Sequence, residues 1–241
     1  NDDPFEGKAL DISGKTKSRS VSHTPDDKDV LAYEFHISRT VPAHHLDEID
    51  PSWLVPLEYH SIDAVHRNGW IHTGGWLHIL DRDHKLLLLK RGPHLVTSPN
   101  CWGLVGEHTY RNEAPMSTVE RGIQEELGLD VWRHVARVDN LTAAPLLYLR
   151  DYGTALGRVD RQVTHVREQR DDPVNVLLDA AHSRVQLQLD NEVADHSWMP
   201  LEDVRQLVQR DISSQKPDFG YLETQLLLLK GIERLMQVLV V

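Results

Sequence analysis

The chain has 241 residues, of which 40% are hydrophobic, so it can bury one substantial core with an extension, or barely two domains. Its formal net charge of -11 argues against general nucleic-acid binding, because nonspecific binding depends on lysine and arginine neutralising phosphates. The single cysteine, Cys101, excludes an intrachain disulfide and a multi-cysteine zinc site. No run of eighteen apolar residues occurs, so we expect no membrane span.

The cellular compartment is only weakly determined by the sequence. One cysteine is compatible with a reducing compartment, which slightly favours a soluble, cytoplasmic protein. The chain begins at Asn1 rather than methionine, which is compatible with a leader, transit peptide or tag that was removed before this numbering starts. The localisation therefore stays open.

The N-terminal part predicts little regular structure. Residues 1 to about 30 are rich in Asp, Lys, Ser and Gly, and we expect them to be flexible unless the core holds them. Residues 30–37 predict a strand, and the three prolines at 42, 51 and 56 then indicate an irregular connection. The adjacent His44 and His45 lie in this connection, where a surface position is preferred to metal binding because neighbouring side chains diverge.

A hairpin is predicted next. Residues 76–80 and 85–90 predict two strands around a turn at 81–84, so they should pair as a hairpin of a mixed sheet. Arg91 follows the second strand, where it either contacts a substrate phosphate or ends the strand in solvent. The lead-in AVHRNGWIHTGGWLHILD is rich in histidine.

The histidines of this lead-in do not predict a metal cluster. His66, His72 and His78 recur at intervals of six, which matches neither face of a helix.

We expect the rest of the chain to be organised around one stretch, GEHTYRNEAPMSTVERGIQEELGL, residues 106–129. Its second half predicts a short helix, with Ser117 and Glu120 as a capping box and Gly128 as the end. An apolar stripe for docking is formed by Val119, Ile123 and Leu127.

Three carboxylates are expected to converge on this helix. Glu125 and Glu126 form an acidic pair, and Glu113 precedes them in a turn-like segment that can fold back along the helix. Carboxylates that meet repel each other unless a cation lies among them, and hard oxygen ligands suit Mg²⁺ or Mn²⁺. An acidic pair alone would more often be a solvated helix face.

The same stretch resembles the signature of the Nudix hydrolases, G-x5-E-x7-R-E-U-x-E-E-x-G-U, where U is a bulky aliphatic residue. Seven of the nine fixed positions agree: Glu113, Arg121, Ile123, Glu125, Glu126, Gly128 and Leu129. The two departures are Glu107, where the signature has glycine, and Gly122, where it has the glutamate that follows the arginine.

The resemblance implies an α/β fold, a Nudix-type α/β/α sandwich with a mixed central sheet. It implies an N-terminal extension at residues 1–59 and a Nudix-like domain at 60–241. It also implies hydrolysis of a small-molecule diphosphate, whose organic part is a nucleoside, a sugar or an isoprenoid, with Mg²⁺ or Mn²⁺ as cofactor. A homodimer stays open.

The resemblance also assigns roles to residues. Glu113, Arg121, Glu125 and Glu126 would be catalytic, and Glu113, Glu125 and Glu126 would hold the metal while Arg121 orients a glutamate. Arg91, Glu107 and His108 are the candidates for substrate binding.

The glycine at position 122 bears directly on activity, because the family's glutamate there helps to bind metal or serves as base. Glycine inside a helix costs about 1 kcal/mol relative to alanine. Either a ligand or water approaches the backbone at Gly122, or the site has lost part of its apparatus. Glu107 and His108 are the candidates to supply a replacement ligand or base. The alternative hypothesis is therefore a catalytically impaired Nudix-like ligand-binding or interaction module.

The histidine-rich lead-in also resembles the branch that includes the isopentenyl diphosphate isomerases. His108 matches the isomerase metal-ligand histidine, but the nucleophilic cysteine would fall at Gly106, and Cys101 is five residues away. Isomerase activity therefore ranks third, since proton transfer at carbon needs both an acid and a base. The ordinary interpretation of Cys101 is a buried free thiol.

Further strands are predicted at residues 131–138, 145–150, 163–168, 174–178 and 185–189. The segment LDNEVADHSWMPLEDVRQLVQ then predicts a short strand with Trp198 and a helix from Pro200. It resembles the family element in which a glutamate completes the metal site, which makes Glu192 a candidate ligand, with Asp190 and Asp195 as local competitors.

The C-terminal tail predicts a helix that packs on the sheet or pairs with another chain. Its apolar stripe consists of Leu222, Leu226, Leu229, Ile232, Leu235 and Leu239.

Overall fold

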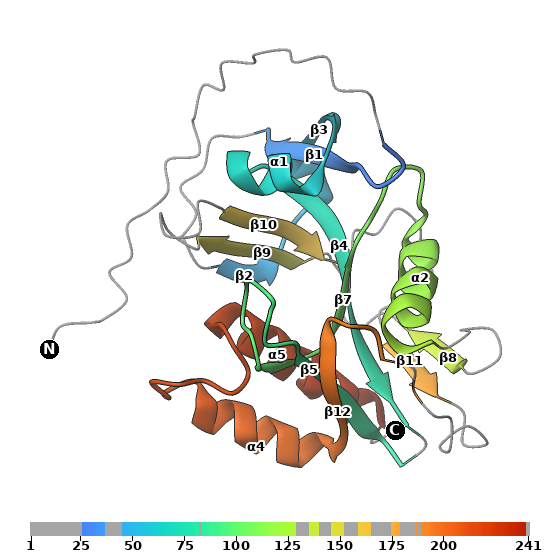
Figure 1. Ribbon diagram of the computed structural model, residues 1–241, viewed down its shortest axis with the longest axis vertical. Helices are drawn as coiled ribbons and strands as arrows, with labels where there is room; N and C mark the ends of the chain where they lie inside the picture. Colours follow the sequence, from blue (N-terminus) through green and yellow to red (C-terminus); the bar gives the residue numbers. More distant parts are fainter. Residues whose placement is uncertain are drawn as a thin grey trace, which may run out of the picture. The chain divides into compact units, whose positions relative to one another are not determined.

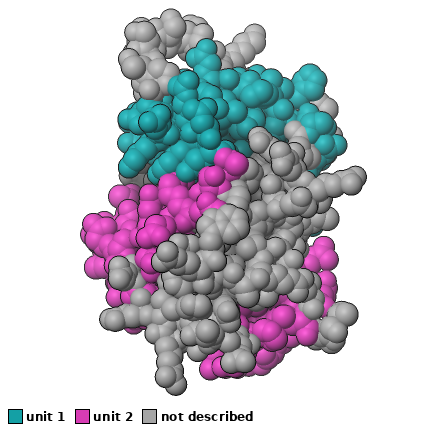
Figure 2. Space-filling model, turned by 90° about the vertical axis from the view of Figure 1, so that its right-hand side faces the viewer, with its two compact units in different colours: residues 1–74, 108–113, 144–166 teal, residues 75–107, 114–143, 167–241 magenta. Residues whose placement is uncertain are grey.

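The computed structural model describes residues 26–36, 45–81, 83–128, 135–139, 146–151, 159–164, 175–178, 187 and 189–239. It divides into two compact units, which Figure 2 shows in different colours. Unit 1 comprises residues 1–74, 108–113 and 144–166, and unit 2 comprises residues 75–107, 114–143 and 167–241.

Unit 1 is built mainly from strands (Figure 1). These are β1 (Val30–Phe35), β2 (His45–Glu48), β3 (Leu54–His60), the first residues of β4 (Ile71–Leu80), β9 (Leu146–Asp151) and β10 (Val159–Thr164). β4 pairs parallel with β10, which pairs antiparallel with β9, and β9 pairs antiparallel with β2. β1 pairs antiparallel with β3 and touches β4 at one position.

Helix α1 (Ile62–Asn68), which the sequence did not predict, packs on these strands. It begins where the Ser61 hydroxyl accepts a hydrogen bond from the Ala64 amide at 3.4 Å. It ends at Gly69, whose φ of 63° lies in the left-handed region that glycine adopts without strain. The buried Val65 of α1 then joins a small core with β1.

The connection after β1 is more regular than its prolines indicate. A 3-10 turn spans Pro51–Trp53, and Pro56 lies inside β3. Among the described residues β3 pairs with β1 alone, so it is an edge strand, where a missing amide hydrogen is tolerated. The predicted irregular connection is therefore wrong over residues 45–48, which form β2, and over residues 51–60, and His44 lies outside the described part of the chain.

Unit 2 holds the rest of β4 and a second group of strands. These are β5 (Lys85–Arg91), β6 (Trp102–Gly103), β7 (Val105–His108), β8 (Val135–Asp139), β11 (Asn175–Leu178) and β12 (Val193–Pro200). β5 pairs antiparallel with β4, β6 and β12, whereas β11 pairs parallel with β4 and antiparallel with β8. The predicted hairpin and the mixed sheet are thus confirmed.

Helices cover both faces of the strands in unit 2. They are α2 (Pro115–Leu127), α4 (Leu201–Asp211) and α5 (Leu222–Leu239). Ile123 and Leu127 of α2 pack against Leu77 and Ile79 of β4 in one core. His78 alternates to the opposite face, where a Cβ on Gly231 of α5 would overlap its ring. The expected α/β fold with helices on either side of a mixed sheet is therefore confirmed.

The C-terminal helix buries a different set of residues from the predicted stripe. Ile232 and Leu235 are buried as expected, but Leu226 is 38% exposed, and Leu227 and Leu228 are buried instead. Four consecutive leucines offer several stripes of helical spacing, so packing rather than spacing selects among them.

The other predicted strands agree where they can be compared. The predictions at 145–150 and 174–178 coincide with β9 and β11, whereas β10 begins four residues before the predicted 163–168. Residues 131–134, 165–168 and most of 1–30 lie outside the described part of the chain, and the two described residues of 185–189 are in no strand. No helix among the described residues is long and apolar enough to cross a membrane.

Candidate functional site

Helix α2, which carries the acidic pair, begins earlier than the predicted capping box requires. Ala114 is its N-cap without a side-chain hydrogen bond, and Pro115 takes the first helical turn. Proline suits that position because its ring fixes φ near the helical value and it has no amide hydrogen to leave unpaired. The capping box of Ser117 and Glu120 is therefore wrong, whereas the helix does end at Gly128, whose φ is 65°.

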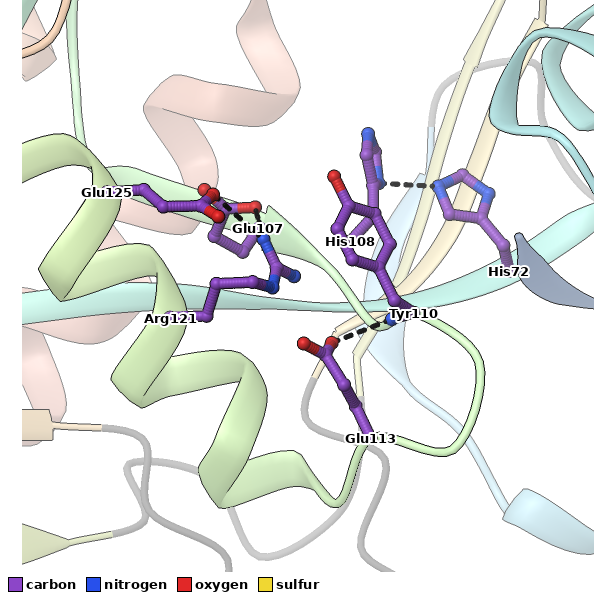
Figure 3. A network of polar contacts seen from close by, with 7 residues as sticks. All are labelled: His72, Glu107, His108, Tyr110, Glu113, Arg121 and Glu125. Carbon is purple, nitrogen blue, oxygen red and sulfur yellow. Dashed lines mark hydrogen bonds and ion pairs between the residues drawn. The ribbon is translucent and has the colours of Figure 1, made fainter. Parts of the chain in front are cut away.

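Arg121 joins two carboxylates of unit 2 (Figure 3). Its Nη1 lies 2.7 Å from Oε2 of Glu107 on β7 and 3.3 Å from Oε2 of Glu125, one turn further along α2. The side chains of Arg121 and Glu107 are 16% and 15% exposed, whereas that of Glu125 is 55% exposed. The pair with Glu107 is therefore the better shielded from water and salt.

Glu126 is partly buried among charges of the same sign. Burial raises the pKa of its carboxyl well above the ordinary value of 4.5, and the negative charges of Glu107, Asp190 and Glu192 raise it further. Arg91 acts in the opposite direction. The ionised form of Glu126 is thus disfavoured unless a cation joins the group.

Arg91 ends β5 with its side chain engaged rather than solvated. Its Nε donates to the Thr97 carbonyl at 3.0 Å, and its Nη2 donates to the Thr97 hydroxyl at 3.2 Å. Glu192 lies next to this strand end, because the Gly92 amide donates to the Glu192 carbonyl at 2.6 Å. The Glu192 residue is exposed. A role of Arg91 in substrate binding and of Glu192 in metal binding stays a prediction.

The two local competitors of Glu192 have backbone partners. Asp190 accepts hydrogen bonds from the Glu192 and Val193 amides, at 2.8 and 3.2 Å. Asp195 is exposed and accepts from the His196 amide at 2.8 Å. Asp190 acts on Glu126 through its charge, as described above, so it is the stronger competitor of the two.

Glu113, the isolated glutamate, belongs to unit 1, where it closes a turn (Figure 3). Its Oε2 accepts a hydrogen bond from the Tyr110 amide at 2.8 Å, and its own amide donates to the Tyr110 carbonyl at 3.1 Å. The turn passes through Asn112 at a φ of 62°, a conformation that asparagine tolerates. The expected convergence of Glu113 with Glu125 and Glu126 stays a prediction.

Three histidines converge in unit 1: His66 in the last turn of α1, His72 on β4 and His108 at the end of β7. One ring nitrogen of each lies within 4.8 Å of the others, and His72 Nε2 is 3.1 Å from His108 Nδ1. His66 and His72 are 5% and 0% exposed. Buried imidazoles that face one another in this way can hold a metal ion.

Two of the lead-in histidines, for which the spacing predicted no metal cluster, do lie in a set whose geometry could hold a metal ion. His78 indeed lies elsewhere, against α5, but His66 and His72 meet through the turn at Gly69 that separates their helix and strand. Their third partner, His108, comes from a strand 36 residues further along the chain. No spacing rule for a single helix or strand detects such a set.

The two candidate metal sites favour different ions. Carboxylate oxygens such as those of Glu125 and Glu126 suit Mg²⁺ and Mn²⁺, whereas three imidazoles suit Zn²⁺ and other transition metals. The carboxylates fit the divalent ion that the resemblance implies, because the negative charges of Glu107, Asp190 and Glu192 act together on Glu126. The histidine cluster is a separate set of donors, in the other unit.

The space at Gly106 bears on the isomerase alternative. A Cβ at this position would lie 2.9 Å from the Trp76 ring, so the ring fills the volume of a side chain there. Cys101 is half-buried, burial raises the pKa of its thiol, and its Sγ donates to the Pro217 carbonyl at 3.6 Å. A raised pKa lowers the thiolate fraction, so Cys101 is a poor nucleophile.

Comparison with models of known protein families shows the family of this chain. The NUDIX domain model matches residues 72–218, which is more than half of the chain and contains both candidate sites except His66. The chain belongs to the NUDIX family. No curated protein matches this NUDIX chain.

Solved structures of low identity are similar to this NUDIX chain. The DR0079 protein of Deinococcus radiodurans is 16% identical with a TM-score of 0.47, covering 79% of this chain and 98% of its own. The Ap4A hydrolase of C. elegans is 16% identical with a TM-score of 0.46, covering 70% and 97%. The MutT protein of Methanosarcina mazei is 14% identical with a TM-score of 0.45, covering 69% and 96%.

Proposed function

We propose that this NUDIX protein is a hydrolase that uses Mg²⁺ or Mn²⁺ to cleave the diphosphate linkage of a nucleoside, sugar or isoprenoid diphosphate. Membership of the family supports hydrolysis, and the retained Arg121, Glu125 and Glu126 support the site. The observation that carries the proposal is Glu126, a partly buried carboxyl among further carboxylates whose pKa is raised well above 4.5.

Carboxylates in this position favour a bound divalent cation over a proton at neutral pH. An ion held by Glu125 and Glu126 would supply a Lewis acid that polarises a phosphoryl oxygen and lowers the pKa of water bound to it. The chain's own part is to hold the carboxylates: Arg121 fixes Glu107 and Glu125 by ion pairs, and the charge of Glu107 acts on Glu126. Arg91 adds a positive charge nearby that would attract a substrate phosphate.

The test is release of phosphate or monophosphate from a panel of nucleoside, sugar, dinucleotide and isoprenoid diphosphates, with Mg²⁺ or Mn²⁺. We expect Glu126→Gln to lower turnover at least about 100-fold, equivalent to about 2.7 kcal/mol of transition-state stabilisation. Glu120→Gln, on the same helix, is the matched control and should retain turnover. No turnover on any substrate, together with no stabilisation by either metal, would refute the proposal and favour the binding module.

The isomerase alternative has less support. Position 106 carries no thiol, and the Trp76 ring fills the space that one would need. A product assay with isopentenyl diphosphate tests it directly, and we expect no isomer.

A further inference from the structure

Glu107 fills the space that a side chain at Gly122 would occupy. A Cβ built on Gly122 would lie 2.5 Å from Cγ of Glu107 and 3.6 Å from its carboxyl carbon. The collision is with the middle of the glutamate side chain, so any residue larger than glycine at position 122 must displace it. This contact gives a physical reason for a glycine inside α2, where it otherwise costs about 1 kcal/mol.

The Glu107 carboxylate is also held in place. Arg121, the residue next to Gly122, binds its Oε2 at 2.7 Å and leaves it 15% exposed. The same guanidinium reaches Glu125 at 3.3 Å, and the Glu107 charge acts on Glu126. One strand-borne carboxylate thus lies with the two carboxylates of the helix, and Arg121 alone cannot neutralise all three.

We propose that Glu107 supplies, from β7, the metal-binding carboxylate that α2 lacks at Gly122, so that the two positions have exchanged side chains. This inference rests on the carboxylate metal site of the proposed function. One contact then explains both departures from the family signature. The glutamate at 107 requires a glycine at 122, and it supplies the negative charge that the signature glutamate at position 122 would carry.

A purely structural role of Glu107, as a partner for Arg121, makes a different prediction. Glu107→Gln keeps the size and a hydrogen-bonding oxygen but removes the charge, so a structural role would leave Mg²⁺ binding unchanged. We expect instead that the Mg²⁺ dissociation constant of the full chain, measured by calorimetry, rises at least about 10-fold. Mg²⁺ is the probe because it prefers oxygen ligands and avoids the histidine cluster.

The exchange itself is tested with Glu107→Gly, Gly122→Glu and their combination. Glu107→Gly should weaken Mg²⁺ binding at least about 10-fold, and Gly122→Glu should lower the melting temperature because two side chains then compete for one space. The double variant should recover both properties, with Mg²⁺ affinity within about 3-fold of wild type. A double variant no better than the sum of its single changes would overturn the inference.

The outcomes separate this inference from the proposed function. Turnover that Glu126→Gln abolishes, with Glu107→Gln leaving both turnover and Mg²⁺ affinity unchanged, would overturn the role of Glu107 alone. The protein could also hydrolyse no diphosphate and yet lose Mg²⁺ affinity in Glu107→Gly and recover it in the double variant. That result would support the metal-binding role of Glu107 and refute the hydrolase. A wild-type chain that binds neither Mg²⁺ nor Mn²⁺ would overturn both.

Discussion

At the scale of single residues, the site depends on carboxylates whose neighbours set their behaviour. Glu125 and Glu126 are adjacent in the sequence, but Glu125 is largely exposed while Glu126 is partly buried beside Asp190 and Glu192. The sequence identified the pair by adjacency on the predicted helix and by its match to the family signature. Which member lies in the lower-dielectric position could not be predicted, because that depends on residues distant in the chain.

The raised pKa of Glu126 predicts a pH dependence of stability. A carboxyl whose pKa is higher in the folded than in the unfolded state binds more protons when folded. Stability of the metal-free protein should therefore fall as pH rises from about 4.5 towards the folded pKa of Glu126, and then level off. Urea unfolding at a series of pH values measures this change in the free energy of unfolding.

Two comparisons identify Glu126 as the source. Glu126→Gln should flatten this part of the profile, and Mg²⁺ should stabilise the wild type more as pH rises, because the ion competes with the proton. An unchanged profile in Glu126→Gln would contradict the assignment.

At the scale of elements, the sequence predicted the hairpin, the acidic helix and the C-terminal helix, but it missed α1, β2 and β3. The strand pair β4 and β5 and the end of α2 at Gly128 follow from local signals, namely two short apolar runs around a turn and a glycine after the last helical residue. The start of α2 was missed because Pro115 satisfies the first turn without any side-chain cap. In α5 the run of leucines left the buried stripe ambiguous until the helix packed.

The link between α4 and α5 depends on one buried carboxylate, Asp211. It accepts hydrogen bonds from the Asp218 and Phe219 amides, at 2.8 and 2.9 Å, and from Nε2 of Gln225 at 2.9 Å. We expect Asp211→Ala to lower the free energy of unfolding by about 3 kcal/mol, since it leaves buried donors without an acceptor. Urea denaturation measures the change.

The matched control for this prediction is Asp203→Ala, an exposed aspartate in the first turn of α4. It should cost less than about 1 kcal/mol, because only the interaction with the helix dipole is lost. Equal losses for the two substitutions would contradict the role of Asp211.

At the scale of the whole molecule, long-range pairing creates sites that no local pattern contains. The histidine cluster draws one residue each from α1, β4 and β7. The contact between Glu107 and Gly122 likewise joins a strand to a helix. The formal charge of -11 describes the chain as a whole and bears on neither site.

The histidine cluster predicts a second class of metal binding. We expect Co²⁺, whose visible absorption reports nitrogen ligands, to bind the wild type, and His72→Ala to weaken that binding at least about 10-fold. Glu126→Gln should leave the Co²⁺ spectrum unchanged, as should His94→Ala, which removes an exposed histidine. Co²⁺ binding that survives His72→Ala would contradict the site.

The sequence by itself determined the family, the α/β class and the acidic helix, because the signature spacing places Arg121, Glu125 and Glu126 on one short helix. It also flagged Glu107 and Gly122 as departures and named Glu107, with His108, as a candidate to replace the ligand or base missing at Gly122. Only the tertiary structure decided that these two share one space and that His66, His72 and His108 share another. Periodicity describes neighbours within an element, whereas these contacts arise when separate elements pack together.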